Sequence, residues 1–199
     1  MSFKFKFLGT GTSVGVPQIG CSCPVCTSTD PRDKRRRCGA YVSSNEGAFL
    51  IDTPPEMREA CIEYGINKVD AVLLTHAHMD HISGFDDIRR FNTINGTSVE
   101  CDPNSPGAFG RVTRIIGKPM NCYALPATIE AMHRIFPYIS SQGGQNGLYR
   151  PQIEFLDNLK KNPLLEGYDV NVNNANANNK ILTIIQVMIF LVFLLLLRL

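Results

Sequence analysis

The alternation of apolar and polar residues divides the first two thirds of the chain into short strands and helices. Three phenylalanines within residues 3–7 alternate with lysines, which is typical of a half-buried strand. Two more strands are predicted at 38–44 and 48–51, joined by an Asn-Glu-Gly turn. A fourth strand is predicted at 69–74, and it leads directly into a stretch rich in histidine. The first half of the chain therefore contains four predicted strands.

Helical periodicity follows two of these strands and returns further along the chain. Residues 56–64 read as a short helix that ends at Gly65. A second helix is predicted at 82–91, after the histidines, and a third, amphipathic helix at 127–136. Between 92 and 123 turn residues dominate. Strands that alternate with helices predict an α/β domain.

The composition changes twice towards the end of the chain. Residues 171–179 contain six asparagines in nine positions, which is typical of a low-complexity segment. After Lys180 the chain becomes almost wholly apolar. These changes predict three parts: a domain over 1–168, a linker over 169–180 and an apolar tail over 181–199.

Bulk properties narrow the function classes. The chain has 199 residues, of which 44% are hydrophobic, so one domain with a sizeable core is expected. A net charge of +2 gives no general case for a nucleic-acid partner, and none is predicted. Residues 1–6 lack the apolar core of a signal peptide. We therefore predict a cytoplasmic protein, whose seven cysteines are reduced and available to metal.

Two other motifs have plain structural explanations beside functional ones. The glycine-rich loop at 9–15 does not match the spacing of a dinucleotide-binding loop. The basic run at 32–37 could steer an anionic substrate, but such runs are more often a solvated surface.

The sequence THAHMDH at 75–81 holds three of the four histidines of the chain. Imidazole and carboxylate are ligands for zinc, manganese and iron. In an extended loop, residues two apart point the same way, so His76 and His78 can meet one metal. Asp80 and His81 lie on the next turn and can face a second metal, as a dinuclear hydrolytic site requires. The alternative is a histidine-rich loop that binds nothing.

This motif resembles the H-x-H-x-D-H signature of the metallo-β-lactamase superfamily. The segment 49–52 is similar to the superfamily strand that ends in aspartate, and 71–75 to the strand that enters the motif. The opening 7–13 and the later 35–38 resemble one branch, which contains the cyclic phosphodiesterase of phosphonate breakdown. The resemblance extends over roughly residues 3 to 165.

The resemblance implies a four-layer αββα sandwich and metal-dependent hydrolysis of a small anionic, phosphodiester-like substrate. By that likeness His76 and His78 would bind the first zinc or manganese ion. Asp80 and His81 would bind the second, and Asp80 is the predicted catalytic residue. Asp52 would hold the ligands from behind, as carboxylates that contact ligating histidines do.

A second cluster, Cys21, Cys23 and Cys26, places three thiols within six residues. Thiolates at this spacing suit a structural zinc ion. The same branch has a three-cysteine zinc site at this place, completed by a late histidine. No histidine follows His133 here, so the fourth ligand is not identified. The alternative is three free cytosolic thiols.

The family pattern also calls for ligands that come after the histidine motif. A third histidine on the first metal, a bridging aspartate and a final histidine are expected. His133 lies in a helical context, and Asp157 and Asp169 are weak bridging candidates. The sandwich and its dinuclear site are therefore predicted to be incomplete in their second half.

The apolar tail over 181–199 has two possible explanations. Residues 181–197 would form a helix of roughly 25 Å, near the lower limit for crossing a bilayer. The tail could thus be a membrane anchor with the domain left in the cytosol. It could also replace the rest of the domain in a truncated or misread gene product. A hydrolase and a non-catalytic, membrane-tethered binding module both remain as functions.

Overall fold

The computed structural model describes five stretches of the chain: residues 4–45, 47–100, 102–104, 113–139 and 151–157. Residues 1–155 form one compact unit, and of the second unit, 156–199, only the first two residues are described. The predicted boundaries at 168 and 180 and the apolar tail lie outside the described residues. Among the described residues, no helix combines the length and the apolar character needed to cross a membrane.

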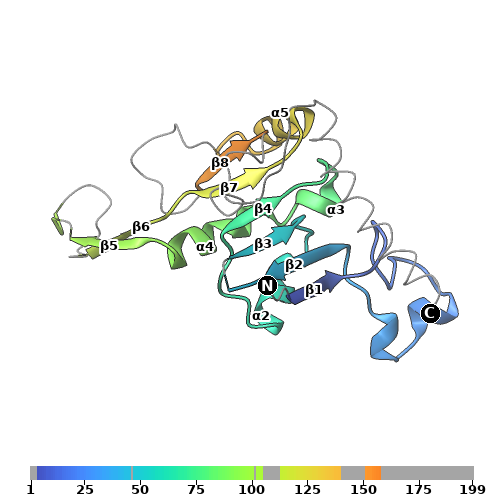
Figure 1. Ribbon diagram of the computed structural model, residues 1–199. Helices are drawn as coiled ribbons and strands as arrows, with labels where there is room; N and C mark the ends of the chain where they lie inside the picture. Colours follow the sequence, from blue (N-terminus) through green and yellow to red (C-terminus); the bar gives the residue numbers. More distant parts are fainter. Residues whose placement is uncertain (1–3, 46, 101, 105–112, 140–150, 158–199) are drawn as a thin grey trace. The chain divides into compact units, whose positions relative to one another are not determined.

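A mixed six-stranded sheet runs through the first unit in the order β1-β2-β3-β4-β7-β8 (Figure 1). Its strands are β1 Lys4–Gly9, β2 Gly39–Ser43, β3 Ala48–Ile51, β4 Ala71–Leu73, β7 Met120–Tyr123 and β8 Ile153–Leu156. β1, β2 and β3 are antiparallel neighbours, whereas β3, β4 and β7 are parallel. Because parallel strands end at the same edge, the segments that follow β3, β4 and β7 meet there.

Short helices connect the strands. They are α1 Pro24–Thr27, α2 Met57–Glu63, α3 Met79–Ile82, α4 Arg89–Ile94 and α5 Pro126–Ile135, with 3-10 turns η1 Pro31–Asp33 and η2 Phe85–Ile88. β5 Thr97–Glu100 and β6 Thr113–Ile116 form a separate antiparallel ribbon. In Figure 1, α3 and α5 lie at the same end of the sheet. That end is the edge where β4 and β7 finish.

The core is built on one row of residues across the three parallel strands. Val72 pairs in register with Leu50 on one side and with Cys122 on the other, and all three are 0% exposed. Phe85 and Ile82, from the segments after β4, are equally buried in the same cluster. Burying each large apolar side chain contributes about 1.5–3 kcal/mol. The elements around the histidine motif are therefore anchored in the core.

The buried side chain of Asn92, at 2% exposure, connects α4 to the residues just before β7 and β8. Its Nδ2 donates to the carbonyl oxygens of Lys118 at 2.8 Å and Gln152 at 3.0 Å. Its Oδ1 accepts from the backbone N–H of Gln152 at 2.9 Å. A polar side chain is tolerated at this depth because its hydrogen-bonding groups are paired.

The glycine-rich loop at 9–15 lies against the basic run at 32–37. Gly11 donates its N–H to the carbonyl oxygen of Arg36 at 2.7 Å, and Val16 and Arg35 exchange two hydrogen bonds of 2.9 Å. A Cβ atom on Gly9 would lie 2.0 Å from the carbonyl oxygen of Arg37. Glycine is required here because two backbone segments come closer than any side chain permits.

Three local expectations need correction. Phe5 in β1 is 43% exposed, and burial in that strand is confined to its last two residues, so the half-buried alternation is wrong. The single helix predicted at 82–91 is divided into α3, η2 and α4, and α3 begins within the histidine motif at Met79. The stretch 92–123 contains parts or all of four elements that turn signals concealed. Its strands are only four residues long, too short to show clear alternation.

Candidate metal centre

The histidine motif and Asp52 follow neighbouring parallel strands. Asp52 comes directly after β3, and the segment from Thr75 to His78 follows β4. His78 has an extended backbone, whereas Asp80 and His81 lie on the single turn of α3. The motif thus changes from extended loop to helix after His78, earlier than the helix start predicted at residue 82.

Asp52 is the most buried acid of this edge, at 3% exposure. Its φ of 58° is left-handed, a conformation that aspartate tolerates better than most residues. Its carboxylate accepts from the backbone N–H of Thr75 at 2.8 Å and lies 2.7 Å from Nδ1 of His81. Asp52 therefore joins the end of β3 to both halves of the motif.

His81 and Asp80 present their polar atoms to each other. Nε2 of His81 lies 3.3 Å from Oδ2 of Asp80. Two ligands of one tetrahedral zinc ion, with bonds of about 2.0–2.1 Å, lie roughly 3.3–3.4 Å apart. Because Asp52 takes the Nδ1 side of His81, Nε2 is the nitrogen available to a metal. The pair therefore fits one metal ion without rearrangement.

His76 and His78 lie next to this pair. The ring centroids of His76 and His78 are 4.6 Å apart, and those of His76 and His81 are 4.1 Å apart. Nδ1 of His76 lies 3.0 Å from the hydroxyl oxygen of Thr75. His78 is exposed at the surface. The structure thus brings all three histidines of the motif together.

The surroundings shift the pKa values of the two partly buried histidines, His76 and His81, in opposite directions. Burial lowers the pKa of His76, and the nearby His81 lowers it further. Burial also acts to lower the pKa of His81, but the hydrogen bond and charge of Asp52 outweigh it and leave that pKa raised. In the metal-free protein, His81 is therefore protonated in preference to His76.

Backbone contacts fix α3 against the segment after Asp52. Thr53 donates its N–H to the carbonyl oxygen of His81 at 2.7 Å, and Gly84 donates to the carbonyl oxygen of Thr53 at 2.9 Å. A Cβ atom on Gly84 would lie 2.3 Å from the carbonyl oxygen of Pro54. Only glycine allows this approach, which holds His81 over Asp52.

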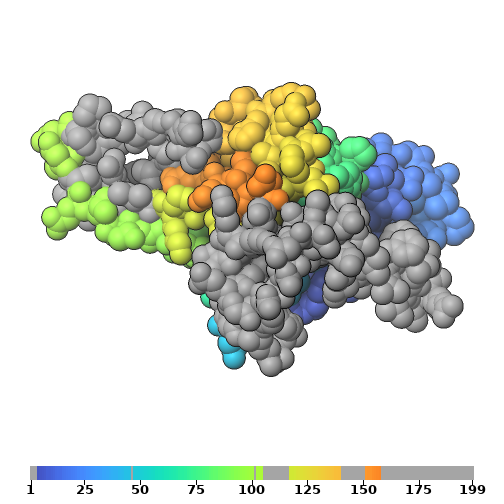
Figure 2. Space-filling model, turned by 45° about the horizontal axis from the view of Figure 1, so that its top comes forward, coloured from blue at the N-terminus to red at the C-terminus, as the bar shows by residue number. Residues whose placement is uncertain are grey.

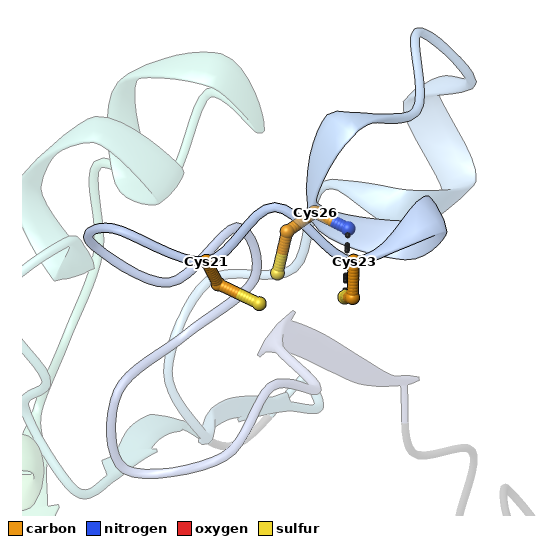
Figure 3. Close-up of side chains that lie close together, drawn as sticks. All are labelled: Cys21, Cys23 and Cys26. Atoms are coloured by element: carbon orange, nitrogen blue, oxygen red, sulfur yellow. Dashed lines mark hydrogen bonds between the residues drawn. The ribbon is translucent and has the colours of Figure 1, made fainter.

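The cysteine cluster lies on the loop that leads into α1 and on α1 itself. Cys21, Cys23 and Cys26 point towards one another (Figure 3), and their sulfur atoms all lie within 4.8 Å of one another. A tetrahedral zinc ion with bonds of about 2.3 Å needs sulfurs roughly 3.8 Å apart. The side chains converge as predicted, and the cluster could hold a metal ion. Among the described residues, it is the one group of three or more His, Cys, Asp or Glu residues whose ligand atoms all lie within 4.8 Å of one another, and the histidine motif does not form such a group.

Hydrogen bonds to its sulfur favour the thiolate form of Cys23. Cys26 donates its N–H towards Sγ of Cys23 at 3.5 Å, and Gln18 donates its N–H to Sγ of Cys26 at 3.4 Å. The first contact, with help from the Cys21 and Cys26 side chains, lowers the pKa of Cys23 to about 7. A thiolate is the form that binds zinc, so Cys23 is the ligand closest to its binding state.

The remaining candidates are His133, Asp157, Asp169 and the basic run. His133 is an exposed residue of α5 whose ring contacts Phe155 of β8 at 4.9 Å, and Figure 2 shows these segments side by side. Asp157 directly follows β8, and Asp169 lies outside the described residues. The basic run is largely neutralised by acids. Its ion pairs are Arg32–Asp30, Arg36–Glu63 and Arg37–Glu56.

Sequence reasoning overlooked Thr75. Its hydroxyl oxygen lies 2.8 and 3.0 Å from the two carboxylate oxygens of Asp52, between that group and His76. Its position as the first residue of the motif was the only signal, because Asp52 lies 23 residues earlier in the chain.

Comparison with known proteins agrees with this arrangement. Residues 37–97 match the family described as the metallo-beta-lactamase superfamily. A solved structure described as a new diphosphatase from the PhnP family superposes with a TM-score of 0.58 and 35% identity, covering 78% of this chain and 50% of that one. The chain thus spans about half the length of that protein.

Two curated relatives match shorter stretches. An octanoyltransferase of Porphyromonas gingivalis is 49% identical over 83 residues, which is 41% of this chain and 17% of that protein. Coenzyme PQQ synthesis protein B of Methylobacterium nodulans is 30% identical over 91 residues, 39% of this chain and 30% of that protein. Such small shares transfer no activity from either name. The matched segment, which contains the histidine motif, and the mixed α/β sheet that carries it together show a metallo-β-lactamase fold.

Proposed function

We propose that this chain is a metal-dependent hydrolase of the phosphodiesterase type. The observation that carries the proposal is that His81 lies between two carboxylates. Its Nδ1 is 2.7 Å from Oδ2 of Asp52, and its Nε2 is 3.3 Å from Oδ2 of Asp80. A buried carboxylate behind a histidine, with a second carboxylate in front of it, is the arrangement of a held metal ligand.

Each residue of the motif has a role in this proposal. His76 and His78 would hold one zinc or manganese ion, and Asp80 and His81 a second. The metals would supply charge to the attacking and leaving oxygens of a phosphate ester. Asp80 is the assigned catalytic residue because its carboxylate, next to His81, can take a proton from the attacking water. The cysteine cluster would hold a structural zinc ion.

The substrate class rests on the solved diphosphatase at 35% identity. We infer a small anionic phosphate ester, with a phosphodiester as the leading case. Arg32, Arg36 and Arg37 of the basic run are paired with acids, and in this proposal the metals would supply positive charge for such a substrate.

A second candidate follows from the ligands that the chain carries. After His81 the sequence offers one more histidine, His133, and α5 turns it towards Phe155. A binding module that holds metal weakly and catalyses nothing would have the same motif. For either function we propose a cytoplasmic domain. In the binding module, residues 181–199 would attach that domain to a membrane, whereas in the hydrolase they would replace the rest of the domain in a truncated gene product.

The deciding experiment uses the whole 199-residue chain with added zinc or manganese and bis(p-nitrophenyl) phosphate. We expect slow, metal-dependent cleavage, below the usual enzyme range of about 1–10³ per second. His78→Ala should abolish it, and the matched control His133→Ala should not. Cleavage that survives chelation would contradict the proposal. Metal bound at the motif with no cleavage of any phosphate ester would favour the binding module.

A further inference from the structure

Thr75 stands between the buried carboxylate of Asp52 and the ring of His76. Its hydroxyl oxygen lies 2.8 Å from Oδ2 of Asp52 and 3.0 Å from Nδ1 of His76. Its backbone N–H donates to Oδ1 of Asp52 at 2.8 Å. Thr75 therefore has two hydrogen bonds to the carboxylate and a third to the histidine.

The available protons determine the direction of these bonds. A carboxylate only accepts hydrogen bonds, and a threonine hydroxyl has a single proton to donate. With Asp52 as a carboxylate, the hydroxyl proton of Thr75 points to it. The lone pairs of that hydroxyl then face Nδ1 of His76, so Nδ1 must carry a proton. The opposite arrangement would place two acceptors 2.8 Å apart with no proton between them.

We propose that Thr75 is a positioning residue, through which Asp52 sets the tautomer and orientation of His76. The same carboxylate contacts Nδ1 of His81 directly at 2.7 Å. One buried acid thus places a proton on Nδ1 of both histidines and leaves both Nε2 atoms as metal ligands. The link to catalysis rests on the proposed function, whereas the tautomer does not.

Further contacts hold Asp52 in place for the hydrogen-bonded chain from Asp52 through Thr75 to His76, here called the relay. Its N–H donates to the carbonyl oxygen of Leu73 at 2.8 Å, which fixes it to the end of β4. Its left-handed φ of 58° makes the backbone leave the direction of β3 at this residue. Local strain of this kind persists where surrounding contacts impose it. A hydroxyl that only filled space would not need a carboxylate so constrained.

The test compares Thr75→Val, which keeps the shape and the backbone N–H, with Thr75→Ser, which keeps the hydroxyl. Nitrogen chemical shifts of the histidine rings report the tautomer directly in the metal-free chain. At about pH 8.5 histidine is neutral. We expect His76 to be protonated on Nδ1 in the wild type and in Thr75→Ser. In Thr75→Val it should shift towards Nε2, while His81 keeps its Nδ1 proton.

Two results would overturn the proposal. The first is a wild-type His76 protonated on Nε2, which requires no variant to fold. The second is a folded Thr75→Val chain whose His76 tautomer is unchanged. Zinc affinity provides the functional readout: we expect a loss of about 10–100-fold in Thr75→Val and full rescue by serine. If the tautomer changes as expected but zinc never binds the motif, the proposed function fails while the relay stands.

Discussion

Nδ1 of His81 lies 2.7 Å from Oδ2 of Asp52, although 29 residues separate them in the chain. The contact joins the ends of two parallel strands and fixes which nitrogen of His81 faces Asp80. The same carboxylate, only 3% exposed, also receives the N–H and hydroxyl of Thr75. Asp52 therefore organises the candidate metal centre without itself being a predicted ligand.

Asp52→Asn should weaken metal binding while leaving the fold in place. Asparagine tolerates the left-handed backbone at this position, so the substitution removes charge with little added strain. The amide can no longer accept from every donor around it, and His81 loses its fixed orientation. We expect zinc affinity at the motif to fall about 10–100-fold in calorimetric titration. The exposed acid-to-amide control Glu130→Gln should bind zinc like the wild type, and equal affinity of the two variants would contradict the role of Asp52.

Gly84→Ala should destabilise the domain and disturb the motif together. The new methyl group would lie 2.3 Å from the carbonyl oxygen of Pro54, so α3 must move away from the segment after Asp52. Overpacking of this kind costs about 1–3 kcal/mol, which denaturant unfolding can measure. Ser83→Ala, an exposed neighbour, is the matched control. Unchanged stability in Gly84→Ala would show that the contact between α3 and Pro54 is looser than described.

The thiols should differ in their reactivity towards iodoacetamide. Hydrogen bonds lower the pKa of Cys23 to about 7, whereas burial raises the pKa of Cys61 to about 11 and raises that of Cys122 as well. Because the thiolate is the reactive form, mass spectrometry should find Cys23 alkylated first and the two buried cysteines last. Zinc added beforehand should protect Cys21, Cys23 and Cys26 as a group. Protection of Cys23 alone would exclude a three-sulfur site.

The inner histidines should titrate in a fixed order in the metal-free protein. The lowered pKa of His76 and the raised pKa of His81 mean that His76 loses its proton first as pH rises. The contact between protonated His81 and Asp52 thus stabilises the metal-free fold below the ordinary histidine pKa. This stabilisation is lost as pH rises through the raised value. An NMR pH titration of the ring protons measures the order, and the reverse order would refute these electrostatics.

The sequence predicted the motif-bearing half of the fold better than the rest. The strands around the Asn-Glu-Gly turn and the strand before the motif follow from residue type and local spacing, whereas the partnership of Asp52 was implied by the family resemblance. The position of Asn92 follows from neither, because its partners Lys118 and Gln152 come from distant segments. The break in the predicted helix at 82–91 could not be predicted either, because it depends on the hydrogen bond from the N–H of Gly84 to the carbonyl oxygen of Thr53. Contacts between distant segments decided these features, and a periodic pattern contains no information about them.

The central claim is that the histidine motif binds metal, and a zinc titration of the ¹⁵N-histidine-labelled 199-residue chain tests it most directly. The four histidines act as separate reporters within one molecule. We predict that the ring signals of His76, His78 and His81 shift or broaden as zinc is added, whereas those of His133 do not. The Nε2 resonance of His81 should respond most, because that atom faces Asp80 at 3.3 Å. Zinc taken up while all three motif histidines remain unperturbed would assign the metal to other residues and contradict the account.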